Sequence, residues 1–362
     1  MSVKNLSECP VCKSISLAKF NSYKHTCYAC SDCNSVFHKK KEGKYLFEWF
    51  LPVKLLSKFL PRQVVLRLFH APIKKFDPSE FYDGYKKQSL NPSSIKISQA
   101  DQIYDILNLN NINLQNLEIL DISGGPGVVA SKFKDKCKRI IVSEFSDISV
   151  KAMRENLNVD ALKFDYEKDK IEKVVNGKFD LVMIRSSMIF CKDFDKFLVS
   201  LSKVLKPEGY VLIQTIVPTL GEVYWWQQME FKFPIIYSQM AIEKFFYKNG
   251  FNLLYGYREY GSYISIKKRS VGKYGLLGHL FTWLIEFPMV LIYYSLAKKN
   301  KIPIDQSLKH KFLTQLWKFS EKKENFTNSP DIINFDNSST DHQSPDFYQK
   351  YNGFLKKNET GN

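Results

Sequence analysis

The sequence predicts an α/β fold in which helices cover both faces of a mostly parallel sheet. Short apolar runs, of the length of buried strands, alternate with stretches whose apolar residues recur at helical spacing. The strand-like runs are residues 118–122, 139–143, 179–184 and 210–215, and residues 193–205 are the clearest helical stretch between them. Two features flank this region: a cluster of cysteines precedes it, and an apolar segment at 275–297 follows it.

The composition is that of a globular protein with a basic surplus. Of the 362 residues, 44% are hydrophobic, which is enough for a sizeable core. The formal net charge of +16 favours anionic partners such as RNA, phosphorylated sugars or an acidic membrane surface, but does not choose among them. Residues 1–7 are polar and do not resemble a signal peptide, so we expect a cytoplasmic protein.

Changes in composition along the chain predict five segments. Residues 251–257 and 262–268 are expected to form a closing pair of strands at the end of the central domain. The tail is rich in Asn, Ser, Lys and Asp and is expected to be disordered. The segments are a small metal-binding ribbon at 1–40, a helical connector at 41–95, the central domain at 96–268, an apolar and basic helical segment at 269–318, and the tail at 319–362.

Five of the seven cysteines lie between Cys9 and Cys33, and four of them form two Cys-x-x-Cys pairs separated by 17 residues. This spacing predicts a tetrahedral zinc site with Cys9, Cys12, Cys30 and Cys33 as ligands. Four thiolates leave no open position, so the Zn²⁺ would be structural. Cys27 and His25 are alternative ligands, but residues 30–37 resemble the second half of many zinc ribbons, which favours the first set.

A glycine-rich turn follows the first strand-like run. Asp121 ends the run, and Gly124, Gly125 and Gly127 suit a backbone that approaches a ligand closely. A strand, a glycine turn and a helix start together predict a nucleotide-type crevice. The spacing Gly125-x-Gly127-x-x-Ala130 also matches a dinucleotide fingerprint, which leaves an NAD-dependent oxidoreductase as an alternative.

The stretch from Leu117 to Gly127 resembles the first motif of the class I S-adenosylmethionine-dependent methyltransferases. That family places an acid, here Asp121, before its glycine turn; Ser123 stands where the family usually has its first glycine. The resemblance implies a Rossmann-like methyltransferase sheet and S-adenosylmethionine as the cofactor. A carboxylate beside the turn suits the cofactor's ammonium group, so Asp121→Ala is expected to weaken cofactor binding and leave the fold intact.

Later positions extend the resemblance, which covers about residues 99–268. Glu144 ends the second strand and can accept hydrogen bonds from both ribose hydroxyls. Asp165 falls where the family often places an acid near the adenine amine, and Arg185 lies at the crevice edge. The expected cofactor-binding set is Asp121, Ser123, Gly124, Gly125, Gly127, Glu144, Asp165 and Arg185.

The catalytic group is not marked by a motif. No Asn-Pro-Pro-Tyr sequence follows residue 184, and Cys191 lacks a preceding proline. Glu222, Tyr224 and Tyr237 lie in the segment after the fifth strand, which commonly covers the substrate in this family, and are candidates for the general base.

A zinc ribbon joined to such a domain resembles two groups of methyltransferases. One acts on sugar nucleotides, polysaccharides and related small molecules, and the other methylates ribosomal RNA. Because Lys and Arg are scattered, with no dense basic run in the ribbon, a small-molecule or saccharide acceptor is favoured over nucleic acid. A non-catalytic binding module is a further alternative.

Two apolar stretches, residues 45–70 and 275–297, are candidates for peripheral contact with the inner face of a membrane. His279, Glu286 and Pro288 interrupt the second stretch, which is therefore expected to be a buried or interfacial helical hairpin; a single membrane span is the alternative.

Overall fold

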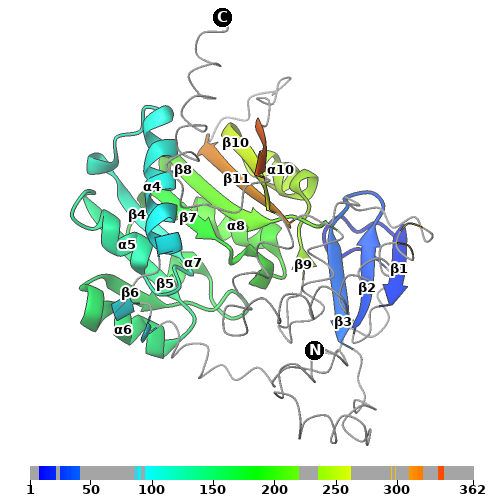
Figure 1. Ribbon diagram of the computed structural model, residues 1–362, viewed down its shortest axis with the longest axis horizontal. Helices are drawn as coiled ribbons and strands as arrows, with labels where there is room; N and C mark the ends of the chain where they lie inside the picture. Colours follow the sequence, from blue (N-terminus) through cyan, green and yellow to red (C-terminus); the bar gives the residue numbers. More distant parts are fainter. Residues whose placement is uncertain are drawn as a thin grey trace, which may run out of the picture.

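The structure is a computed structural model with two sheets, a small antiparallel one and a large one of eight strands (Figure 1). It describes residues 8–21, 25–40, 86–87, 89–90, 94–219, 235–261, 310–320 and 333–337, and the single positions 295 and 298.

Five strands of the large sheet run parallel, in the order β6-β5-β4-β7-β8. Apart from the edge strand β6, each is a run of mostly buried apolar residues, as expected for strands covered on both faces. The order reverses at β4, which has β5 on one side and β7 on the other. Their bounds are Glu118–Ile122 for β4, Arg139–Glu144 for β5, Asp160–Lys163 for β6, Phe179–Arg185 for β7 and Leu205–Ile216 for β8.

Three further strands complete this sheet. β11 (His310–Phe319) lies between β8 and β10 (Phe251–Gly261) and is antiparallel to both. β12 (Ile333–Asn337) pairs in parallel with the outer side of β10. Numbered along the chain from β4, and leaving out β9 of the small sheet, the strands therefore lie in the order 3-2-1-4-5-7-6, with β12 added at the edge.

This arrangement corrects two expectations and leaves a third untested. Among the described residues, β10 has β11 on one side and β12 on the other, whereas the expected partner strand at 262–268 lies outside the described residues. The expected helical segment at 269–318 ends in a strand, and the expected disordered tail contains β12. The physical reason is that β8 and β10 each present unpaired backbone groups that β11 satisfies. The central domain therefore extends beyond residue 268.

Helices cover both faces of the sheet, which confirms the predicted fold class. Ser146, Asp193 and Ser238 cap three of them by accepting a hydrogen bond from a backbone N–H of the first turn. One face carries α4 (Ser94–Leu109), α5 (Val128–Phe133) and α6 (Asp147–Leu157); the other carries α7 (Ile171–Val174), α8 (Phe194–Ser202) and α10 (Gln239–Lys248).

Alternate residues of each strand point to opposite faces and form two cores. Ile119, Val142 and Leu181 pack toward α4, α5 and α6. Leu120, Val182 and Ile184 pack toward α7, α8 and α10. Two short 3-10 helices, η2 (Leu114–Asn116) and η3 (Met188–Phe190), precede β4 and follow β7.

The small sheet and the turns next to it, residues 8–40, hold the five N-terminal cysteines and are called the cysteine ribbon below. Its strands are β1 (Leu17–Asn21), β2 (His25–Cys30) and β3 (Val36–Lys40), paired as an antiparallel meander. A fourth strand, β9 (Ile235–Ile236), belongs to a distant part of the sequence and pairs with β3. Figure 1 shows the cysteine ribbon, in blue, beside the large sheet, with β9 between the two.

Both predicted membrane-contact stretches, 45–70 and 275–297, fall outside the described residues, apart from the single position 295. Among the residues that are described, no helix combines the length and the hydrophobicity needed to cross a membrane. Most of the predicted connector at 41–95 is likewise not described.

Candidate functional site

The candidate site lies at the carboxyl ends of β4, β5 and β7. The strand order reverses at β4, and in open α/β sheets such a reversal leaves a crevice outside the carboxyl ends of the strands. Asp121, Glu144 and Arg185 stand at or next to the ends of these three strands.

The glycine turn adopts a left-handed backbone at Ser123, Gly125 and Gly127, with φ angles of 54°, 65° and 74°. Gly124 has no room for a side chain, since a Cβ there would lie 2.6 Å from Val142 Cγ1 and 2.7 Å from Asp121 Oδ2. The turn is tied to β5 because the Gly124 N–H donates to the Ser143 carbonyl at 3.2 Å. Serine tolerates this conformation less well than glycine, so Ser123 is mildly strained.

Asp121 and Arg185 form a buried ion pair at the ends of β4 and β7. Arg185 Nη2 donates to Asp121 Oδ2 at 2.7 Å, and Nε lies 3.3 Å from Oδ1. Both side chains are almost fully buried, at 6% and 0% exposure. The carboxylate that was expected to face a cofactor ammonium group is therefore already neutralised by a neighbouring strand.

This pairing also corrects the expectation that Asp121→Ala would leave the fold intact. The substitution would strand the Arg185 guanidinium in the core without a counter-charge, which is strongly destabilising. Asp121 must therefore be considered part of the structure of the turn as well as a candidate binding residue.

Glu144 is aimed at the glycine turn. Its Oε2 accepts the Gly125 N–H at 2.9 Å, and its Oε1 accepts the Phe145 N–H at 2.8 Å. Burial raises the pKa of Glu144 to about 7, against the lowering effect of these backbone N–H groups. Two N–H bonds leave lone pairs on the carboxylate, so hydroxyl groups of a ligand can still be accepted.

Asp165 lies in the turn after β6. Its Oδ1 accepts the Glu167 N–H at 2.9 Å, and Lys168 Nζ is 3.7 Å from Oδ2. Next to it, the Tyr166 hydroxyl lies 3.0 Å from Ser187 Oγ and also contacts Ser123. These contacts connect the ends of β4, β6 and β7.

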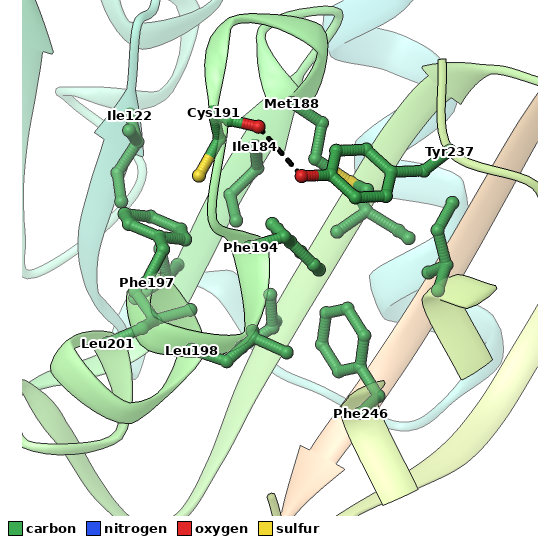
Figure 2. Close-up of a cluster of buried hydrophobic side chains, with 14 of the residues drawn as sticks. Ile122, Ile184, Met188, Cys191, Phe194, Phe197, Leu198, Leu201, Tyr237 and Phe246 are labelled. Carbon is green, nitrogen blue, oxygen red and sulfur yellow. Dashed lines mark hydrogen bonds between the residues drawn. The ribbon is translucent and has the colours of Figure 1, made fainter. Parts of the chain in front are cut away.

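The structure describes one of the three candidates for the general base. Glu222 and Tyr224 lie outside the described residues. Tyr237 is buried, and its hydroxyl donates to the Cys191 carbonyl at 2.8 Å (Figure 2). Burial raises the pKa of Tyr237 well above its usual value, so the phenol stays protonated. The structure therefore argues against Tyr237 as a base.

The four predicted metal ligands lie together at one end of the cysteine ribbon. The sulfur atoms of Cys9 and Cys33 are 3.7 Å apart and those of Cys12 and Cys30 are 3.4 Å apart. All four sulfur atoms lie within 4.8 Å of one another. Cys27 is buried but outside this group, and the side chain of His25 is not among those described.

Two site features were missed at the level of sequence. Phe145, directly after Glu144, is 49% exposed and could offer a ring face to a base. Its position after the strand-ending acid was the available signal. The Tyr166–Ser187 contact joins residues 21 apart in sequence, and no local pattern indicates it.

The fold and this site define the class. A 3-2-1-4-5-7-6 sheet with an antiparallel seventh strand, a glycine turn after the first strand and an acid ending the second form a class I methyltransferase domain.

Comparisons with known proteins agree with this class. A family model described as a methyltransferase domain matches residues 96–255. A ubiquinone biosynthesis O-methyltransferase from Rickettsia bellii is 26% identical over 112 residues, which are 29% of this chain and 44% of that protein. A ubiquinone/menaquinone biosynthesis C-methyltransferase from Idiomarina loihiensis is 28% identical over 124 residues, covering 30% of this chain and 48% of that protein. The chain thus spans less than half the length of these curated relatives.

Solved structures also align with the chain. Coclaurine N-methyltransferase, bound to N-methylheliamine and S-adenosylhomocysteine, aligns with a TM-score of 0.44 and 13% identity over 74% of this chain and 91% of that one. An N-methyltransferase from Bradyrhizobium japonicum gives a TM-score of 0.37 and 10% identity over 62% and 97%.

The family match and the sheet order together show that residues 96–255 belong to a class I S-adenosylmethionine-dependent methyltransferase domain, and the predicted resemblance is confirmed.

Proposed function

We propose that the protein transfers a methyl group from S-adenosylmethionine to a small-molecule acceptor. The observation that carries this proposal is the Glu144 carboxylate, hydrogen-bonded to the Gly125 N–H at the end of β5 in a methyltransferase sheet. A glycine turn with a carboxylate fixed beside it offers close backbone approach and a hydroxyl acceptor in one place.

In this proposal, different residues of the site bind different parts of the cofactor. Glu144 accepts the ribose hydroxyls, Phe145 stacks on the adenine, and Asp165 lies near the adenine amine. Two N–H groups of Arg185 donate to Asp121. Its remaining N–H groups suit the carboxylate at the methionine end of the cofactor. Ser123, Gly124 and Gly127 shape the turn around that end.

When bound, the cofactor supplies the electrophilic methyl group. The protein has to hold the acceptor nucleophile in line and, where the nucleophile carries a proton, remove it. Glu222 and Tyr224 are the proposed candidates for that base, since the phenol of Tyr237 is held by Cys191.

The acceptor class is proposed from two directions. The combination of ribbon and domain favours a saccharide or sugar nucleotide, and the names of the matched relatives favour the precursor of a quinone. Methyl transfer from labelled S-adenosylmethionine to each class, in parallel reactions, distinguishes them. An RNA acceptor is the third arm of the same assay.

We also propose that Cys9, Cys12, Cys30 and Cys33 hold one structural Zn²⁺. Tetrahedral coordination with Zn–S bonds of about 2.3 Å places sulfur atoms about 3.8 Å apart. Two of the sulfur separations, 3.7 and 3.4 Å, are close to this value, and all four sulfur atoms lie within 4.8 Å of one another, so small shifts would complete the site. The thiolates would fill all four positions, so the metal would support the fold and not the chemistry.

The proposed function is tested by calorimetric titration of the folded, zinc-loaded chain with S-adenosylhomocysteine. We expect one site per chain and no heat with NADH. Absence of binding by a folded sample would refute the methyltransferase proposal, and binding of NADH alone would favour the oxidoreductase alternative. For RNA, a weak affinity that hardly changes with salt would count against a nucleic-acid acceptor.

A further inference from the structure

The segment Ile235–Ser238 joins the cysteine ribbon to the large sheet. Its first two residues form β9 and pair with Val36 and Phe37 of β3. Ser238 Oγ then donates to the carbonyl of Cys33, one of the proposed zinc ligands, and the Ser238 N–H donates to Ser35 Oγ at 3.1 Å. Ser238 Oγ also accepts the Ala241 N–H at 3.1 Å and so caps α10.

Tyr237, in the middle of this segment, points the other way, into the large domain. Its hydroxyl donates to the Cys191 carbonyl at 2.8 Å, and its ring centroid lies 5.6 Å from that of Phe194. Figure 2 shows this hydrogen bond beside Met188 and above the rings of Phe194 and Phe246. Tyr237 is only 1% exposed, so the bond forms in a nearly water-free environment.

Cys191 is the last residue of the loop 186–191, which follows β7. The first residues of this loop lie at the candidate cofactor site. Ser187 Oγ is 3.0 Å from the Tyr166 hydroxyl and 3.5 Å from the Ile122 carbonyl of β4. Arg185, just before it, is paired with Asp121. The loop 186–191 thus has one end at the glycine turn and the other on Tyr237.

We propose that Tyr237 is a positioning residue through which the metal-loaded cysteine ribbon fixes the loop 186–191 against the cofactor crevice. This inference rests on the proposed function and on the proposed zinc site. The chain of contacts runs from Cys33 through Ser238 and β9 to Tyr237, and from Tyr237 through Cys191 to Ser187. A tyrosine is required because phenylalanine would fill the same volume but leave the buried Cys191 carbonyl without this donor.

Hydrogen exchange of the folded, zinc-loaded chain tests this in Tyr237→Phe, with Tyr28→Phe as the matched control. Tyr28 lies in the same ribbon, stacked on Phe37 at 5.6 Å. We expect amides of residues 186–194 to exchange about tenfold faster in Tyr237→Phe, since one buried hydrogen bond is lost. Exchange of β5 residues 139–144 should stay as in the wild type, and zinc content should be unchanged.

The affinity for S-adenosylhomocysteine, measured well below the unfolding temperature, provides the second readout. We expect a threefold to tenfold weaker affinity, roughly the effect of one lost hydrogen bond, in Tyr237→Phe and no change in Tyr28→Phe. Removing zinc from the wild type with a chelator should likewise speed exchange at 186–194.

A lower unfolding temperature without faster local exchange or weaker binding would show a purely structural tyrosine and overturn the inference. Unchanged exchange at 186–194 after zinc removal would also overturn it. If the wild type bound no S-adenosylhomocysteine, the proposed function itself would fail. If the wild type bound and Tyr237→Phe bound equally well, only the coupling would be refuted.

Discussion

At the scale of single residues, the Asp121–Arg185 pair shows how the tertiary structure changes the meaning of a motif. The sequence indicates that an acid ends the first strand, but not that a guanidinium from β7 lies 2.7 Å from it. Two strand ends that are 64 residues apart in sequence share one buried charge pair. The acid therefore shapes the turn through Arg185 as well as through its own position.

Asp121→Ala is expected to lower the free energy of unfolding by about 3–5 kcal/mol, because it leaves Arg185 charged and unpaired in the core. Urea titration followed by circular dichroism measures the change. The double variant Asp121→Ala/Arg185→Met removes both charges and should recover most of the loss. Equal destabilisation of the single and double variants would contradict this account of the pair.

Glu144 is expected to make cofactor binding depend on pH. Burial raises the pKa of its carboxyl to about 7, so in the ligand-free protein the group is protonated below that pH. Ribose hydroxyls donate to the ionised form, so the affinity for S-adenosylhomocysteine should rise about tenfold between pH 6 and pH 8 and then level off. Titration calorimetry at several pH values measures it.

The raised pKa of Glu144 also makes the stability of the fold depend on pH. The pKa of Glu144 is about 7 in the folded protein and 4.5 in the unfolded chain. Between pH 4.5 and pH 7 the folded protein therefore keeps a proton on Glu144 that the unfolded chain has released. This group therefore reduces stability as the pH rises through that window. Glu144→Gln should remove both the stability effect and the pH dependence of binding. An affinity that is flat with pH in the wild type would rule out the role given to Glu144.

At the scale of elements, features that depend on residues close in sequence could be predicted, and features that depend on distant residues could not. The strands β4, β5, β7 and β8 are apolar runs bounded by turns, and local pattern was enough to find them. The turn residues and Glu144 lie in or next to those runs, so the motif around them could also be recognised. The partner of Asp121 and the contact of Tyr166 with Ser187 depend on how distant strands meet, which no local pattern encodes.

β11 was missed for a physical reason. The helical expectation for residues 269–318 came from their apolar and basic composition, and the spacing of Phe312, Leu313, Leu316 and Trp317 does not contradict a helix. In the sheet, β11 is covered on both faces, and Leu313, Thr314, Leu316 and Trp317 are all buried. A strand buried on both faces does not need to alternate, and its pairing with β8, about 100 residues earlier, fixes its conformation.

Ending the chain before β11, at residue 300, is expected to prevent folding of the methyltransferase domain. The truncation leaves β8 and β10 without their common neighbour and removes Trp317, which stacks on Phe246 at 4.5 Å between centroids. Soluble yield and circular dichroism of the truncated chain test this. A milder variant, Trp317→Ala in the full chain, should cost about 3–5 kcal/mol.

A chain ended at residue 300 that stayed folded and bound S-adenosylhomocysteine would show that the central domain ends near 268, as the sequence first indicated. Truncation after residue 340 is the matched control, because it keeps β11 and β12.

At the scale of the whole molecule, the cysteine ribbon and the methyltransferase domain share one buried core. Cys9, Cys30, Cys33 and Phe37 belong to the same cluster of buried side chains as residues of β4, β7, α8 and α10. The β3–β9 ladder and the Ser238 bonds add polar contacts across the same boundary. The two parts are therefore packed together as the layers of one domain are.

This shared core predicts that both parts unfold together. Scanning calorimetry of the zinc-loaded full chain should show a single transition, because opening the ribbon exposes the buried cluster to which Phe194 and Tyr237 also belong. Chelation of zinc should lower the midpoint by roughly 5 °C or more, since metal-binding free energy contributes to folding free energy. Cys30→Ser should behave like the chelated protein, whereas Cys137→Ser, outside the four-sulfur group, should keep its zinc and its midpoint. Two separate transitions, with only the lower one sensitive to chelator, would instead mean that the ribbon is an independent module, and a route from zinc to the cofactor crevice would lose its physical basis.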